Sequence, residues 1–211
     1  MIVICSISFL LLNLIIQTKS QMAKPLTIRP SEVELIKTLP FPNSSFRYIV
    51  RGDQANNEFV IFESFYATEG PGLHVHVRED ELFHVMEGYV QFIVDGKQFC
   101  ANPGDYVYVP KNITQGTRIH DGTFPDKPVR IQIQLVPGGL EKFLDEIAPL
   151  YDGNQHNFTL QREISEKHGI YDLGSVDWQD LGCFKKNSMS NSASTISNPI
   201  LNIFQLLKSF F

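Results

Sequence analysis

The chain has 211 residues, which suits one domain with short extensions, and its 43% hydrophobic and 19% charged residues are typical of a globular protein. It carries 18 basic and 23 acidic residues, which gives a formal net charge of -5. No long basic run is present, so the sequence argues against nucleic acid as a partner.

The first twenty residues differ from the rest of the chain. Residues 2–16 are apolar except for three polar side chains. An apolar run of about 15 residues is shorter than the roughly 20 that a bilayer-spanning helix needs, and it is typical of a signal-peptide core. Small residues flank Lys19, as a cleavage site requires. We therefore expect residues 1–20 to be a signal peptide and the mature protein to be secreted, with an uncleaved membrane anchor as the alternative.

Residues 21–45 contain Pro and Ser, and we expect them to be an N-terminal arm. Residues 46–137 form short segments rich in β-branched and aromatic side chains, separated by turns. The expected strands are FRYIV, FVIFESFYA, LHVHV, LFHVMEG, YVQFIVDG, DYVYVP and VRIQIQLV. Asp95-Gly96, between VQFIV and KQFCA, predicts a hairpin turn. Many strands with no helix between them indicate an antiparallel sandwich or barrel.

One stretch of this region, GLHVHVREDELFHVMEG, combines histidines with a carboxylate. Side chains alternate between the faces of a strand, so His74 and His76 point to the same side. Glu81 begins the next strand and, in an antiparallel hairpin, can lie opposite the first. Two imidazoles and one carboxylate are a ligand set that divalent first-row metals accept, with positions left open for substrate or oxygen. The alternative is a solvated surface on which the histidines pair with the acidic turn 78–80.

The pattern becomes helical after Pro137. GGLEKFLDEIAPL predicts a helix with one apolar face, formed by Leu140, Phe143, Leu144 and Ile147. TLQREISEKHG predicts a second short helix, with His168 in its last turn and Gly169 as the C-cap. We expect both helices, in a C-terminal extension over residues 138–184, to pack on an open edge or mouth of the sheet.

Residues 185–211 are expected to be a Ser- and Asn-rich linker followed by an apolar tail. The tail has helical spacing, so it could dock on the barrel or contact a membrane surface. It also loosely resembles a GPI-attachment signal, which is the minor alternative to secretion as a free protein.

Two cysteines remain beyond the leader, Cys100 and Cys183, which either form one disulfide or stay separate thiols. Three N-x-Ser/Thr acceptors make the chain a glycoprotein if it is secreted. We expect Asn43 and Asn157 to be accessible and Asn112, in a tight loop, to be hidden.

The histidine stretch resembles the first motif of the cupin superfamily, represented here by His74, His76, Glu81 and Gly88. PGDYVYVPKNITQ resembles the second motif, and the order of strands and turns agrees throughout the barrel region. VPGGLEKF, with the helices after it, is similar to the tail of quercetin-dioxygenase-like single-domain cupins. The resemblance implies an all-β fold: an antiparallel jelly-roll barrel of six to eight strands with two short C-terminal helices. It also implies one divalent transition metal (Fe, Mn, Ni or Cu) at the inner floor of the barrel.

The second motif departs from the family at one position, where Gln115 stands in place of the usual fourth ligand, a histidine. His84 and His120 lie at odd spacings from Glu81 and Gln115, and therefore on the opposite strand faces. We expect Gln115 to point at the metal held by the other three residues, either as a ligand or through a metal-bound water. The alternative is that it caps the loop and that the site is inactive.

These features favour a secreted metal-dependent dioxygenase of the quercetinase-like type acting on a small organic substrate, with Glu81 as both ligand and proton shuttle. The alternatives are a non-catalytic small-molecule-binding or storage cupin and a non-redox enzyme acting on sugars. The family also suggests a homodimer. Four aromatic side chains could line a substrate pocket or fill the barrel core, and we expect the core: Phe83, Phe92, Tyr106 and Tyr108.

Overall fold

The computed structural model describes residues 24–36, 44–67, 69–119, 128–151 and 157–184. The expected signal peptide, Asn43, His120 and the C-terminal tail lie outside the described residues. None of the helices in the described part of the chain has the length and apolar composition needed to cross a bilayer.

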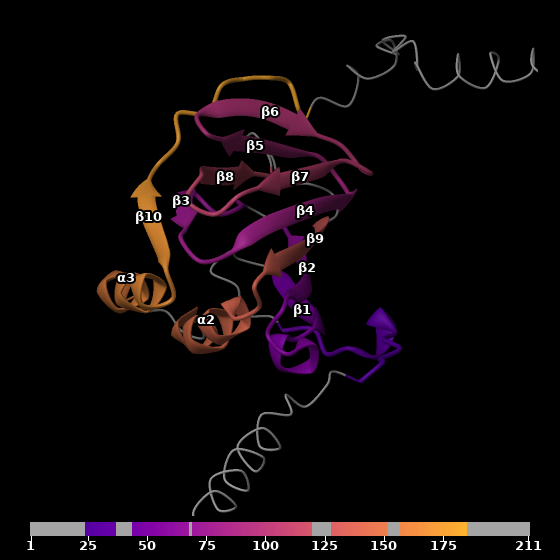
Figure 1. Ribbon diagram of the computed structural model, residues 1–211. Helices are drawn as coiled ribbons and strands as arrows, with labels where there is room; N and C mark the ends of the chain where they lie inside the picture. The colour runs from indigo at the N-terminus through magenta and orange to yellow at the C-terminus, as the bar shows by residue number, and fades with distance from the viewer. Residues whose placement is uncertain (1–23, 37–43, 68, 120–127, 152–156, 185–211) are drawn as a thin grey trace, which may run out of the picture.

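Two five-stranded antiparallel sheets face each other and form the barrel (Figure 1). The first sheet has the order β1-β2-β9-β4-β7, with β1 (Ser45–Val50), β2 (Val60–Tyr66), β9 (Val129–Val136), β4 (Asp80–Glu87) and β7 (Tyr106–Val109). The second sheet has the order β10-β3-β8-β5-β6, with β10 (Ile170–Gly174), β3 (Leu73–His76), β8 (Thr114–Arg118), β5 (Val90–Val94) and β6 (Lys97–Ala101). The prediction of an all-β antiparallel jelly-roll with two short C-terminal helices is therefore confirmed.

Two of these strands were not predicted. β8 contains Gly116 and lacks the apolar alternation that marks a strand in a sequence. β10 lies in the segment expected to be helical, and it forms the outer edge of the second sheet by pairing with β3. The described residues thus contain more strands than the six to eight that the resemblance implied.

Strict alternation of side chains places the core between the sheets. In β9, Ile131, Ile133 and Leu135 are buried while the residues between them are partly exposed. Burial of each such side chain contributes about 1.5–3 kcal/mol. The alternation also shows that the expectation for the aromatic residues was half wrong.

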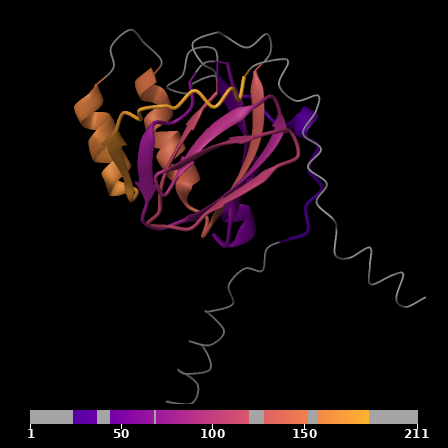
Figure 2. The ribbon, with the colours of Figure 1, turned by 90° about the horizontal axis from the view of Figure 1, so that it is seen from above.

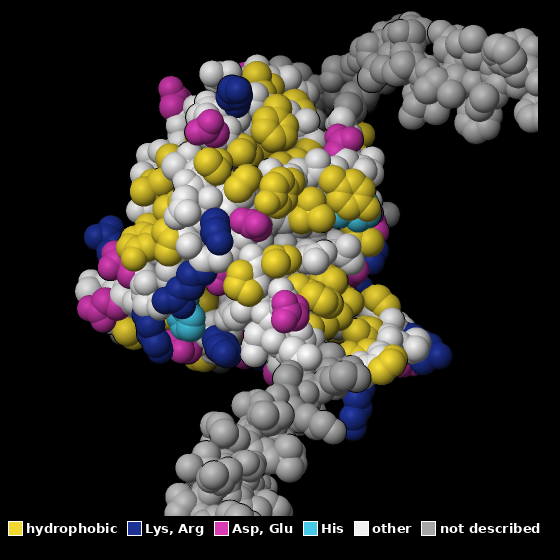
Figure 3. Space-filling model, viewed as in Figure 1, with side chains coloured by type: hydrophobic (Ala, Val, Ile, Leu, Met, Phe, Trp, Pro, Cys, Tyr) yellow, Lys and Arg dark blue, Asp and Glu magenta, His cyan; other side chains and the backbone are white. Residues whose placement is uncertain are grey.

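Phe83 and Phe92 lie in the core, with rings 5.2 Å apart, as expected. Tyr106 and Tyr108 lie on the outer face of the first sheet and are 64% and 57% exposed. In β7 the valines take the inward positions, which forces the tyrosines outward. Figure 3 shows apolar side chains gathered across the face above β4 and β7.

The two helices are α2 (Leu140–Ile147) and α3 (Phe158–Lys167), and three short 3-10 turns complete the described elements: Pro30–Glu32, Gly52–Ala55 and Ala148–Tyr151. Leu140, Leu144 and Ile147 are buried on one face of α2, as predicted. α3 contacts β10 and α2, so α3 lies at the β10 edge of the second sheet (Figure 2), while α2 is tied to the first sheet, where Tyr48 of β1 donates to the Glu141 carbonyl at 3.1 Å. Gly169 follows α3 with a φ of 81°, a left-handed conformation that glycine adopts without strain.

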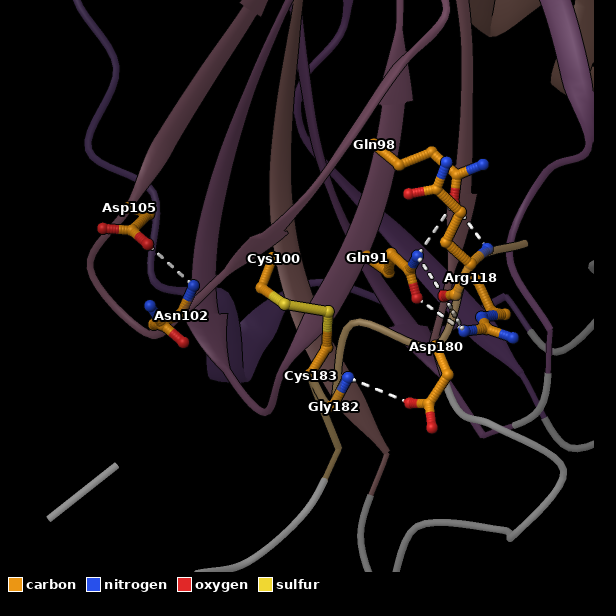
Figure 4. Close-up of a disulfide and its surroundings, with 10 residues drawn as sticks. Gln91, Gln98, Cys100, Asn102, Asp105, Arg118, Asp180, Gly182 and Cys183 are labelled. Atoms are coloured by element: carbon orange, nitrogen blue, oxygen red, sulfur yellow. Dashed lines mark hydrogen bonds between the residues drawn. A yellow bond between two sulfur atoms is a disulfide. The ribbon is translucent and has the colours of Figure 1, made fainter. Parts of the chain in front are cut away.

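The segment after β10, residues 175–184, crosses the outer face of the second sheet, and we name it the C-terminal strap. Cys100 of β6 forms a disulfide with Cys183 of the strap, which settles the open question of their pairing (Figure 4). Gln98 donates to the Asp177 carbonyl at 2.8 Å and accepts from the Gln179 amide at 2.9 Å. Gln91 of β5 also donates to the Gln179 carbonyl at 3.0 Å, so the strap is held by side-chain amides of β5 and β6 as well as by a covalent bond.

The two glycosylation acceptors that the structure describes are both exposed. Asn112 was expected to be hidden, but it lies on the surface with a φ of 65°. Asn157 is the N-cap of α3, and its side-chain oxygen accepts from the Leu160 amide at 3.0 Å.

Candidate metal centre

His74 and His76 of β3 meet Glu81 of β4 between the two sheets. One potential ligand atom from each residue lies within 4.8 Å of the others. The expected hairpin was wrong, because β3 and β4 belong to different sheets and do not pair. The chain crosses from one sheet to the other in the turn after His76, and the carboxylate faces the imidazoles across the barrel interior.

The His74 ring is oriented by the backbone. Its Nδ1 lies 2.8 Å from the Gly72 carbonyl oxygen, which can only accept, so Nδ1 carries the proton and Nε2 keeps its lone pair. Burial, together with the neighbouring His76, lowers the pKa of His74 to about 4. This imidazole is therefore neutral at pH 7, which is the form that binds a metal.

The His76 ring lies between two carboxylates. Its Nε2 is 3.6 Å from Glu81 Oε2, and its Nδ1 is 3.6 Å from Glu79 Oε2. Burial acts to lower the pKa of His76, but Glu81 and Glu79 outweigh it and raise the pKa above its ordinary value. Burial also raises the pKa of Glu81, against the opposing effects of His76 and Gln115.

Gln115 reaches the same centre. It lies opposite His74 in the pairing of β3 with β8, and it is 2% exposed. Its Nε2 donates to Glu81 Oε2 at 2.5 Å, while its Oε1 is buried without a hydrogen-bond partner among the described residues. The amide therefore contacts the expected carboxylate ligand; ligation by its oxygen stays a prediction.

His84 lies on the outer face of the first sheet, where it stacks on Tyr106 with ring centroids 4.2 Å apart. It is thus separated from the centre by its own strand, as its odd spacing from Glu81 predicted.

Three residues near the centre were not identified from the sequence. Glu79 is 4% exposed, although the acidic turn was considered only as a solvated surface. Asp172 of β10 lies opposite His74, a position that depends on the unpredicted strand. Tyr66 of β2 is buried, which raises its pKa to about 12, and the Glu81 charge adds to this effect. The position of Glu79, three residues after His76, was the one available signal.

The centre suits a divalent metal. Ligand atoms about 2.1 Å from one ion lie about 3.0–4.2 Å apart. The 3.6 Å between His76 Nε2 and Glu81 Oε2 lies within this range. All the ligand atoms lie within 4.8 Å of one another, so the side chains need to move together only slightly to bind one ion. Two imidazoles and a carboxylate accept several first-row metals, so the donor set does not select one.

The chain is similar to known proteins over the barrel region. The family model described as a cupin domain matches residues 62–125, a span that contains His74, His76, Glu81 and Gln115. A quercetin 2,3-dioxygenase from Bacillus subtilis (strain 168) is 29% identical over 113 residues. That match covers 51% of this chain and 31% of the bacterial enzyme, so this chain corresponds to about a third of it.

Several solved structures are also similar. KdgF from Halomonas sp. aligns with a TM-score of 0.47 and 12% identity, over 56% of this chain and 99% of that protein. An RmlC-like cupin from Shewanella frigidimarina aligns with a TM-score of 0.46 and 15% identity, over 57% and 99%. The polyketide cyclase RemF from Streptomyces resistomycificus aligns with a TM-score of 0.44 and 18% identity, over 54% and 80%.

Proposed function

The chain belongs to the cupin superfamily, and from that premise we propose that it is a metal-dependent dioxygenase of the quercetinase-like type acting on a small organic substrate. The observation that carries the proposal is the convergence of His74, His76 and Glu81 inside the barrel. The partial similarity to a quercetin dioxygenase supports the choice of reaction.

In this proposal His74, His76 and Glu81 hold the ion. A bound divalent metal would supply a Lewis acid with open positions for substrate. Glu81 is a buried carboxylate, 5% exposed, and a carboxylate beside a metal can serve as both ligand and general base. It would take the proton of a substrate hydroxyl, while the hydrogen bond from Gln115 keeps the carboxylate in place.

A second candidate is a non-catalytic binding or storage protein on the same barrel. The contact between Gln115 and Glu81 favours it, because the amide engages the ligand carboxylate where a fourth imidazole is usual. A carboxamide is a weaker ligand than an imidazole for a borderline metal, so this site would hold an ion less firmly.

Metal content separates the two candidates. The protein is purified without chelators, its metals are quantified by elemental analysis, and oxygen uptake is measured with a panel of phenolic substrates. A stoichiometric redox metal with substrate-dependent oxygen uptake supports the dioxygenase. A metal-free protein that binds the same compounds without consuming oxygen supports the binding role.

We also propose that the protein is extracellular. The disulfide between Cys100 and Cys183 supports an oxidising compartment, since such bonds rarely persist in the cytosol. Expression in a eukaryotic cell should release protein beginning near Gln21 into the medium. Cytosolic protein that retains Met1 would contradict this proposal.

A further inference from the structure

The turn between β3 and β4 contains a carboxylate that the proposed metal ligands do not explain. Glu79 is 4% exposed, and its Oε2 is buried without a hydrogen-bond partner among the described residues. The Nδ1 atom of His76 is buried and unpartnered in the same way. These two atoms lie 3.6 Å apart and face each other.

Such an arrangement is unfavourable unless the two atoms interact. A buried polar group without a hydrogen bond destabilises a protein by about 1–3 kcal/mol. The separation is about 0.6 Å longer than a good N–H···O bond, so a small rotation of either side chain closes it. In the same turn, Val77 and Arg78 are exposed, and Arg78 donates to the Lys167 carbonyl at the end of α3 at 2.8 Å, so Glu79 is the side chain of these three that is buried.

We propose that Glu79 is a positioning residue of the metal centre, accepting the Nδ1 proton of His76 so that Nε2 presents its lone pair to the ion. The proposal rests on the metal site proposed above. An ionised carboxylate only accepts, so it selects the tautomer with the proton on Nδ1. Outer partners of this kind fix the ring and strengthen the imidazole as a donor.

The two histidines would then differ in strength as ligands. The neutral carbonyl of Gly72 orients His74, whereas a charged carboxylate orients His76. Glu79 and Glu81 together supply two negative charges, which balance a divalent ion while Gln115 stays neutral.

The test compares Glu79→Gln with the matched control Glu58→Gln, which removes the same charge from an exposed position. Co2+ affinity is measured by titration calorimetry on the purified full-length mature chain, and the visible absorption of bound Co2+ reports its ligand field. Glu79→Gln should weaken binding by about 10–100-fold and shift the absorption bands, while the control should match the wild type. Thermal melts without metal establish that each variant is folded.

The outcomes separate this inference from the function on which it rests. If the wild type binds no Co2+, the proposed metal site fails, and the role of Glu79 fails with it. If the wild type binds but Glu79→Gln and Glu79→Asp both bind equally well with the same spectrum, only the role of Glu79 is overturned; both variants are needed because a carboxamide oxygen can still accept from Nδ1. If Glu79→Gln does not fold, Glu79→Asp decides in its place, because its shorter side chain cannot reach Nδ1 and should weaken binding similarly.

Discussion

The two sheets contribute unequally to the candidate site and are supported differently. The second sheet supplies His74, His76 and Gln115 from the adjacent strands β3 and β8, whereas the first supplies Glu81 alone. The disulfide-linked strap crosses the outer face of the second sheet, while the outer face of the first sheet leaves Tyr106 largely exposed.

This difference shows how a short strand is made rigid enough to hold ligands. β3 has four residues, and its pairing with β8 spans only His74 and Val75. β10 pairs with its other side, and the strap continues from β10 to the disulfide. Glu81 needs no support from a distant segment of this kind, because its strand β4 lies inside the first sheet and pairs with both β7 and β9. Binding sites require ligands on rigid elements, and here distant segments provide that rigidity for the histidines.

The largest expected effect tests whether the inner face of the second sheet is the metal-binding face. His76→Ala should abolish metal binding, with a loss of more than about 100-fold, because two of the three strong ligands do not retain a borderline ion. His84→Ala makes the same change on the outer face of the first sheet and should leave affinity unchanged. Calorimetric titration of both variants measures the difference. Equal affinities for His76→Ala and the wild type would show that the metal interpretation is wrong.

The contrast between the regions also explains which parts of the structure the sequence predicted. Strands such as β9 can be predicted from the sequence, because burial of one face makes apolar and polar residues alternate. The two-residue spacing of His74 and His76 likewise shows that both side chains lie on the same face of a strand. Two features could not be predicted in this way: the strand β10 and the inward direction of Glu79. Both depend on tertiary contacts made by polar or exposed residues, and such contacts produce no periodic pattern in the sequence. The meeting of Glu81 with the histidines was expected, but across a hairpin. Short-range spacing does not reveal that the turn passes from one sheet to the other.

The disulfide provides the next test, which asks whether the strap supports the second sheet in particular. A bond between residues 83 positions apart restricts the unfolded chain, and its removal should lower the free energy of unfolding by about 2–4 kcal/mol. The variant carries Cys100→Ser and Cys183→Ser, and urea denaturation measures its stability. Amide hydrogen exchange should increase most in β10, β3 and β6. Equal increases in β1 and β2 would contradict a regional role for the strap.

A buried ion pair on the outer face of the first sheet gives a smaller, pH-dependent effect. Glu63 is 2% exposed and binds Arg47 at 2.6 Å and Arg130 at 3.0 Å. Burial acts to raise the pKa of Glu63, but hydrogen bonds from Arg130 and Arg47 outweigh it and hold the pKa below its ordinary value. The stabilising contribution is therefore complete above the unfolded pKa near 4.5 and is lost as the pH falls through the folded pKa.

Glu63→Gln should lower the free energy of unfolding by about 1–2 kcal/mol at pH 7 and by less at pH 3. Urea denaturation at both pH values measures this loss. Glu87→Gln is the matched control at the exposed end of the same ion-pair network, and its effect should be within about 0.5 kcal/mol. An undiminished loss for Glu63→Gln at pH 3 would contradict the ionic origin of the contribution.

The smallest effect concerns Gln115, the second-sheet residue that contacts the first sheet's carboxylate. In Gln115→His, an imidazole opposite His74 can supply a fourth strong ligand, and we expect metal affinity to rise by about tenfold. The hydrogen bond to Glu81 is lost at the same time, which limits the gain. Gln115→Ala loses that bond without adding a ligand, so it should bind a few-fold more weakly than the wild type. Calorimetric titration should therefore give the highest metal affinity for Gln115→His, a lower affinity for the wild type and the lowest for Gln115→Ala. If Gln115→His and Gln115→Ala bind the metal equally well, the side chain at position 115 does not reach the ion. The second sheet then holds the metal through His74 and His76 alone.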